Sequence, residues 1–143
     1  MRRAAGERGS ALVLGVGLVA ACLLAAVVLV DATSAFLQRQ QLLAVADAAA
    51  LAGAQAVDLP TYYAEGASAA TTLDVRRVPE RVRDHLDRGG ARALIPGLVL
   101  EEVSSDGRRV VVALSAPLAL PFLSGAVSER IRVESVAQLA YRG

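Results

Sequence analysis

Residues 9–30 contain no charged side chain, and this stretch constrains the fold more than any other feature of the sequence. A bilayer core about 30 Å thick needs roughly 20 apolar residues in a helix. The sequence therefore predicts a transmembrane helix at residues 11–30, preceded by a short basic tail at residues 1–10. The lipid bilayer is the first partner that the sequence implies.

The charges on either side of the span predict its orientation. Basic residues close to a membrane helix are retained on the cytoplasmic side. We therefore expect a single-pass protein of the cytoplasmic membrane, with its N-terminus inside and its C-terminal domain extracytoplasmic. The charges in question are three arginines before the span and one aspartate directly after it: Arg2, Arg3, Arg8 and Asp31.

Two other N-terminal signals compete with a retained anchor. A secretory signal peptide also has a basic and then an apolar region, but that apolar region is usually about 7–15 residues long. Cleavage within the small residues that follow the span would release the domain. Residues 19–22 also resemble a lipobox, which would make Cys22 a lipidation site, although the chain stays apolar as far as Val30. We favour the retained anchor, in which Cys22 is a small apolar residue of the helix.

The helix is expected to continue past the membrane as a stalk, residues 31–58. This segment has no proline, one glycine and many good helix formers, so one helix is predicted from Ala11 to about Ala56. Such a stalk must pack against something. Its predicted apolar stripe repeats at helical spacing and consists of Leu37, Ala44, Ala48, Leu51 and Gln55.

Small residues recur every four positions inside the span, at Gly17, Ala21 and Ala25. In lipid, helices associate through small residues that let their backbones approach closely. This face is therefore a candidate for helix packing. Asp47, on the stalk, is a second candidate for a specific polar contact, and its alternative is a carboxylate exposed to water.

Two sequence segments resemble the N-terminal module of the TadE/TadG-like proteins of the Flp (tight adherence) pilus system. The first is Glu7-Arg8-Gly9-Ser10 before the span, and the second is the alanine-rich run with Asp47 at residues 40–54. The resemblance covers roughly residues 7–56. It implies a pseudopilin-like or pilus-assembly component of the bacterial envelope, with other pilus or secretion-system membrane subunits, and copies of the chain itself, as partners.

The sequence departs from a prepilin processing site. Such a site has a glycine before the mature N-terminus and a glutamate five residues into it. Here Gly6 and Gly9 are followed at that distance by Ala11 and Leu14. Prepilin-type cleavage is therefore unsupported, which favours an accessory role that stays in the membrane.

The remaining residues, 59–143, predict a small extracytoplasmic α+β domain. Pro60 should end the long helix, and an amphipathic helix is expected at about residues 76–88, with Pro79 in its first turn. Strands are predicted at residues 98–103, 108–114 and 131–141, the first two joined by an Asp-Gly turn. The fold class is thus membrane-anchored α+β, with a long transmembrane and stalk helix, a short amphipathic helix and a three-stranded antiparallel sheet, pilin-like in outline.

Residues 115–125 are apolar but interrupted by two prolines. The prolines exclude a central strand. This segment is expected either to cover the open face of the sheet or to form an exposed apolar loop that touches a partner or the membrane surface. We favour the first of these.

The sequence offers no recognisable catalytic chemistry. His85 stands alone on a charged helix, and no ligand spacing typical of a metal site is present. Glu101 and Glu102 should lie on opposite faces of a strand, which prevents them from sharing a proton. Charge beyond the span is nearly balanced, so a nucleic acid is not indicated. We expect no enzyme, cofactor, metal or small-molecule substrate.

The function predicted from the sequence is a structural or accessory component, similar to a minor pseudopilin, of a Tad/Flp-type pilus assembly or secretion apparatus. The alternative is a stand-alone surface-displayed binding protein or lipoprotein with an alanine-rich signal anchor. A helical stalk after the anchor favours the first, since a lipoprotein has no need of one.

Overall fold

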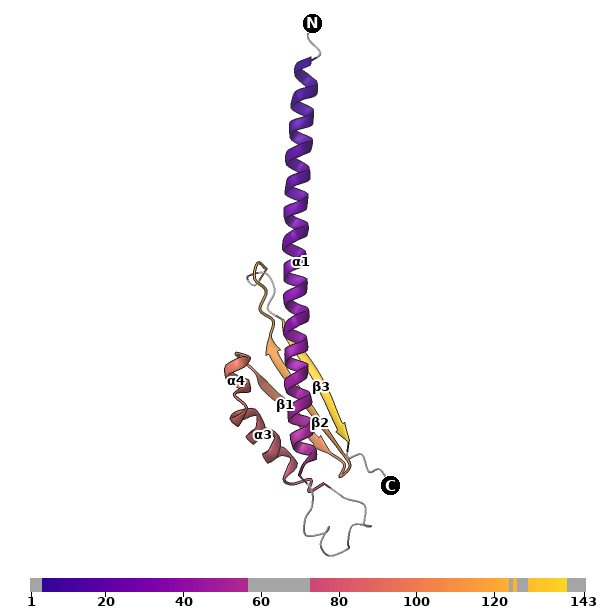
Figure 1. Cartoon of the computed structure of the whole chain (residues 1–143), viewed down its shortest axis with the longest axis vertical. Helices are drawn as coiled ribbons and strands as arrows, with labels where there is room; N and C mark the ends of the chain where they lie inside the picture. The colour runs from indigo at the N-terminus through magenta and orange to yellow at the C-terminus, as the bar shows by residue number, and fades with distance from the viewer. Residues whose placement is uncertain (1–3, 57–72, 124, 126–128, 139–143) are drawn as a thin grey trace, which may run out of the picture.

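The protein consists of one long helix and a small domain of helices and strands packed around its C-terminal part (Figure 1). The structure is a computed structural model, and it describes residues 4–56, 73–123, 125 and 129–138, with the backbone alone for residues 4–9. Pro60, the basic residues Arg2 and Arg3 and the end of the last predicted strand lie outside the described residues.

Helix α1 (Ala4–Ala54) has 51 residues and no break. At 1.5 Å per residue it is about 75 Å long. It begins seven residues earlier than predicted because the leader has no proline, and its alanine, glutamate and arginine residues favour a helix. Figure 1 shows the N-terminal half of α1 projecting away from the domain.

The sheet is antiparallel with strand order β1-β2-β3, as predicted. Its strands are β1 (Val99–Ser105), β2 (Arg109–Pro117) and β3 (Arg130–Gln138). The β1–β2 turn places Gly107 at φ 86°, a conformation that glycine adopts without strain. Asp106 accepts hydrogen bonds from the backbone N–H groups of Arg108 (2.9 Å) and Arg109 (2.7 Å), which lower the pKa of its carboxyl group.

The prediction that no central strand includes residues 115–125 was wrong for the first three of them. The central strand β2 continues to Pro117, which pairs with Arg130 of β3. Pro117 is tolerated because it occupies the last position of the strand, where the loss of its N–H group interrupts no further ladder.

Two further helices complete the domain: α3 (Val78–Arg88) and α4 (Ala91–Leu94). Helix α3 has Pro79 in its first turn and buries Val78, Val82 and Leu86, as the helical spacing predicted. It ends at Gly89. The short helix α4 was not predicted, because four residues are too few to show a period.

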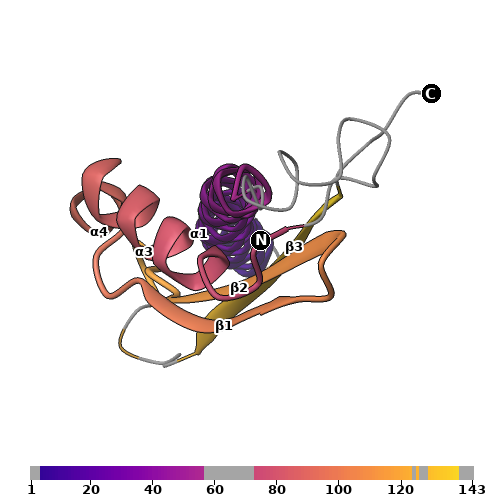
Figure 2. The same ribbon diagram turned by 90° about the horizontal axis from the view of Figure 1, so that it is seen from below.

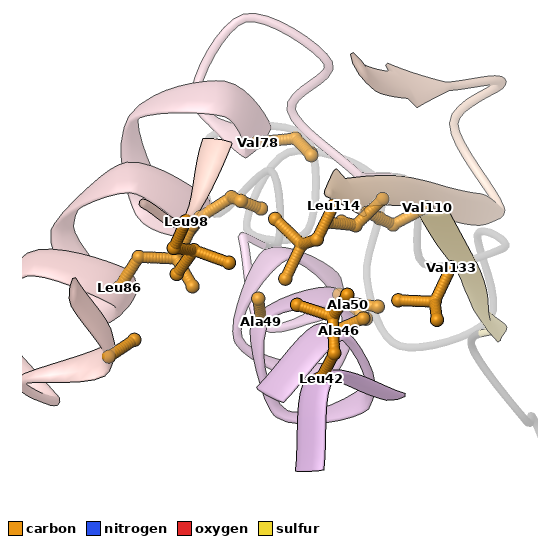
Figure 3. Close-up of a cluster of buried hydrophobic side chains, with 14 of the residues drawn as sticks. Leu42, Ala46, Ala49, Ala50, Val78, Leu86, Leu98, Val110, Leu114 and Val133 are labelled. Atoms are coloured by element: carbon orange, nitrogen blue, oxygen red, sulfur yellow. The ribbon is translucent and has the colours of Figure 1, made fainter. Parts of the chain in front are cut away.

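Helices α1 and α3 lie on the same face of the sheet, which gives the domain two layers (Figure 2). The core forms where they meet β2 (Figure 3). Fully burying one leucine contributes roughly 1.5–3 kcal/mol. The largest fully buried side chains come from all three elements: Leu42, Leu86, Leu114, Val78, Val82, Val110 and Val112.

Gly53 lies where α1 packs tightly against α3 and β2. A Cβ atom built at this position would lie 2.9 Å from Cγ2 of Val82 in α3 and 3.0 Å from Cγ1 of Val110 in β2. Carbon atoms in good contact are about 3.5–4.0 Å apart. The absence of a side chain at residue 53 therefore lets the helix pack against both elements at once.

Candidate functional site

The candidate site of this protein is the surface of α1, because the domain covers only part of it. Within residues 10–30 every residue is exposed except Val27, which is half-buried. The most apolar 18-residue window of the helix has a mean hydropathy of 3.0, and no residue in it is buried. The uncharged segment 9–30 is roughly 33 Å long as a helix, which matches a bilayer core of about 30 Å. Helix α1 could therefore span a membrane.

The small residues predicted to pack against another helix are open in this structure. Gly17, Ala21 and Ala25 are exposed, and no atom lies within 4 Å of a Cβ built at Gly17. Cys22 is a free, exposed cysteine in the same turns of the helix. Nothing in the described chain occupies this face, so its role as a contact stays a prediction.

The predicted stripe of the stalk is not the face that packs on the domain. Leu37 is 55% exposed and Leu51 is 60% exposed, and the other stripe residues, Ala44, Ala48 and Gln55, are exposed as well. The buried face lies on the opposite side of the helix and consists of Leu42, Ala46, Ala49, Ala50 and Gly53. Because alanine is abundant on both sides, the two leucines directed the prediction to the face that the domain leaves open.

Asp47 contacts the sheet through a side-chain hydrogen bond. Its Oδ1 atom accepts a hydrogen bond from the hydroxyl group of Ser135 in β3. Ser135 is 7% exposed, so the bond joins the edge of the helix to a nearly buried position of the sheet. The contact is made within the chain, and it helps to position β3 against α1.

The segment after β2 returns to α1 rather than covering the open face of the sheet, so the role favoured for it was wrong. Gln38 of α1 pairs with the backbone of Ala119 twice: its Nε2 donates to the carbonyl oxygen, and its Oε1 accepts from the N–H group at 3.0 Å. One contact further along, Oδ1 of Asp31 accepts from the N–H group of Phe122 at 3.1 Å. Residues 118–123 are thereby fastened along the helix.

Asp31 is the one charged residue of the described chain that is buried, with 3% exposure. Its Oδ2 atom is also buried and has no hydrogen-bond partner among the described residues. Sequence reasoning used Asp31 only as the first charge after the span. Its contact joins residues 91 positions apart, so no local pattern could have revealed it.

The outer face of the sheet is polar and held by local contacts. A bulge between Leu100 and Glu102 places both glutamates toward this face, contrary to the prediction of opposite faces. Glu101 accepts from Ser115, and Glu102 lies 3.8 Å from the guanidinium group of Arg132. Such exposed pairs contribute little to stability. His85 is exposed, and within the described ranges no group of three or more His, Cys, Asp or Glu residues could hold a metal.

Residues 9–56 match the model of the Tad family, described as "Putative Flp pilus-assembly TadE/G-like". The matched segment begins where the uncharged span begins and ends two residues after the end of α1. It covers about a third of the chain. The resemblance inferred from the sequence is thus confirmed for the N-terminal module. A search of the curated proteins and a search of the solved structures gave no match.

Proposed function

We propose that this chain is a structural or accessory subunit, similar to a minor pseudopilin, of a Tad/Flp-type pilus assembly or secretion apparatus in the bacterial envelope. The observation that carries this proposal is the coincidence of the family match at residues 9–56 with a single unbroken helix. One half of that helix is suited to a membrane, and the other half forms the core of a folded domain. A pilus-related role in general follows from the match, and the accessory role is our proposal.

In this proposal the chain crosses the cytoplasmic membrane once. Residues 1–10 form a cytoplasmic tail, residues 11–30 span the bilayer, residues 31–58 form the stalk and residues 59–143 belong to the extracytoplasmic domain. The arginines before the span support this orientation by the positive-inside rule. The rigid passage of α1 from the span into the core would fix the domain close to the membrane surface.

The partner surface in this proposal is the exposed stripe defined by Leu37, Ala44, Ala48 and Leu51. It lies opposite the buried face of α1, so a partner helix can contact it without displacing the domain. Two leucines more than half exposed on a stalk of small residues favour a close helix–helix contact, since alanine lets two backbones approach. Other pilus or secretion subunits, including further copies of this chain, are the partners that fit.

Site-specific photo-cross-linking in native membranes tests the stripe. A photoreactive residue at Ala44, in the middle of the stripe, should form a cross-link to another Flp-assembly membrane protein or to a second copy of the chain. The matched control is His85, which is also exposed but lies on α3, away from the stripe. Equal cross-linking from both positions, or none from Ala44, would contradict the proposed surface.

A second test addresses the small residues inside the membrane. Gly17→Ile adds bulk to the predicted contact face, whereas Gly15→Ile adds the same bulk two positions away. Nothing lies within 4 Å of a Cβ atom built at either glycine. We expect Gly17→Ile to reduce the yield of cross-linked complex, while both variants reach normal levels in the membrane. An equal loss of cross-linked complex for both variants would contradict a packing role for Gly17, Ala21 and Ala25.

A further inference from the structure

We propose that residues 118–123, here named the interface loop, reach with their Phe122 end into the headgroup region of the same bilayer that α1 spans. The occupant of this exposed apolar loop is thus the lipid surface. The proposal relies on the membrane anchor of the proposed function, but not on the pilus-assembly role or on any protein partner.

The contacts of the interface loop place it next to the end of the span. Phe122 is bonded to Asp31, the residue directly after the uncharged segment, and Ala119 is bonded to Gln38. Asp31 and Gln38 are seven positions apart on the helix, a rise of roughly 10 Å. The chain therefore passes from a contact farther from the span, at Ala119, to a contact at the end of the span, at Phe122. The interface loop therefore runs along α1 toward the membrane, as Figure 1 shows beside the middle of the helix.

The contact with Asp31 places Phe122 at the depth of the headgroup layer. A bilayer of about 40–45 Å around a core of about 30 Å leaves roughly 5–7 Å of polar headgroups on each side. With the hydrocarbon boundary near Val30, Phe122 lies at the inner edge of that layer, whereas Gln38 is roughly 12 Å from Val30 along the helix and holds Ala119 beyond the outer edge. The end of the interface loop that contains Phe122 is thus set at a depth that lipid occupies.

The chemistry of the interface loop fits an interface and not water. Residues 115–127 contain no charged side chain. Phe122 is 62% exposed and Leu123 is 40% exposed. Phenylalanine and leucine are the side chains that segments lying in the headgroup and acyl boundary present to lipid. In lipid these side chains lose their contact with water, which contributes about 25 cal/mol for each Å² removed.

Asp31 acts as a positioning residue for the interface loop. Its carboxylate is nearly fully buried and accepts from the loop backbone. The side-chain amide of Gln38 bonds to both the N–H group and the carbonyl oxygen of Ala119, as a neighbouring strand would. Two polar residues of α1 thus hold an apolar segment at a fixed depth.

Tryptophan quenching in vesicles tests the inference, because the natural chain has no tryptophan. Full-length Phe122→Trp is reconstituted into phosphatidylcholine–phosphatidylglycerol vesicles, with and without lipids brominated on the upper acyl chain. The matched control is Val136→Trp, which replaces a residue 51% exposed on β3, farther from the span. We expect the brominated lipids to quench the Phe122→Trp variant at least about twofold more than the Val136→Trp variant.

Equal quenching of the two variants would overturn the inference. A blue-shifted but unquenched emission from Phe122→Trp would overturn it as well, because it would mean that protein and not lipid covers the indole ring. Flotation of the same vesicles keeps the two proposals distinct, since protein that fails to float has lost its anchor. Asp31→Ala in the Phe122→Trp background should reduce the quenching of the introduced tryptophan while flotation stays normal. Unchanged quenching in that double variant would refute the positioning role of Asp31.

Discussion

Gly53→Ala should destabilise the domain, although the same substitution stabilises most helices. Alanine is favoured over glycine in a helix interior by about 1 kcal/mol. Against this, the new methyl group would lie 2.9 Å from Val82 and 3.0 Å from Val110, on two different elements. Valine is stiff at χ1, so no single rotation relieves both overlaps. Overpacking of a core costs about 1–3 kcal/mol, which leaves a net loss of about 0–2 kcal/mol, with a central value near 1 kcal/mol.

The assay is pulse proteolysis of the full-length protein in detergent across a urea series. With a slope of about 1–2 kcal/mol per molar urea for a domain of this size, the midpoint should fall by roughly 0.5–1 M. Gly15→Ala is the matched control, because it adds the same methyl group to the same helix where nothing lies within 4 Å. Its midpoint should stay at or above that of the wild type, because the methyl group meets no other atoms and alanine favours the helix.

A midpoint for Gly53→Ala at or above the wild-type value would refute the packing argument. Removing one of the two valine contacts provides an internal check on this argument. In a Val82→Ala background one of the two contacts is absent, so the cost of Gly53→Ala should be about half as large, a coupling that a double-mutant cycle measures.

Three further predictions follow from the polar contacts and the span. Folding lowers the pKa of Asp106, so its contribution to stability is present above the ordinary pKa of 3.8 and is lost as pH falls through the folded value. Asp106→Asn should therefore flatten the acid side of a curve of stability against pH. An unchanged curve would contradict this. Asp47→Ala and Ser135→Ala should each lower the free energy of unfolding, with a coupling of about 0.5–1.5 kcal/mol in a double-mutant cycle, whereas additive effects would show that the bond contributes nothing. Cys22→Ser should leave both the membrane level and the intact mass, apart from the single substitution, unchanged; a lipid-modified wild type starting at residue 22 would instead support the lipoprotein alternative.

Elements with strong periodicity were predictable from the sequence. Val78, Val82 and Leu86 repeat at the spacing of a helix, and the described part of β3 alternates between core and water as expected. The uncharged span was equally clear. These signals are local, and each depends on contrast between large apolar and charged side chains.

The stalk lacked that contrast. Ala46 is buried and Ala48 is exposed, yet the same side chain stands at both positions, so only the fold distinguishes them. The exposed leucines Leu37 and Leu51 pointed to the opposite face. A helix that serves the domain on one side and a partner on the other is expected to mislead a search for a single apolar stripe.

The interface loop was hidden for a different reason. The contacts of Asp31 with Phe122 and of Gln38 with Ala119 join residues 91 and 81 positions apart. A sequence pattern reports neighbours along a strand or a helix, whereas these contacts arise only after β2 and β3 are placed on α1. The two prolines correctly indicated that the strand ends, but they did not reveal that the chain continues along α1.

The most direct test of the proposed function is to delete the gene in the native host and measure the Flp fibres sheared from the cell surface. We predict that surface fibres are lost or strongly reduced, and that the wild-type chain restores them while a chain with Ala44 and Ala48 replaced by glutamate, folded and present in the membrane, does not. Normal fibres in the deletion strain would contradict the account.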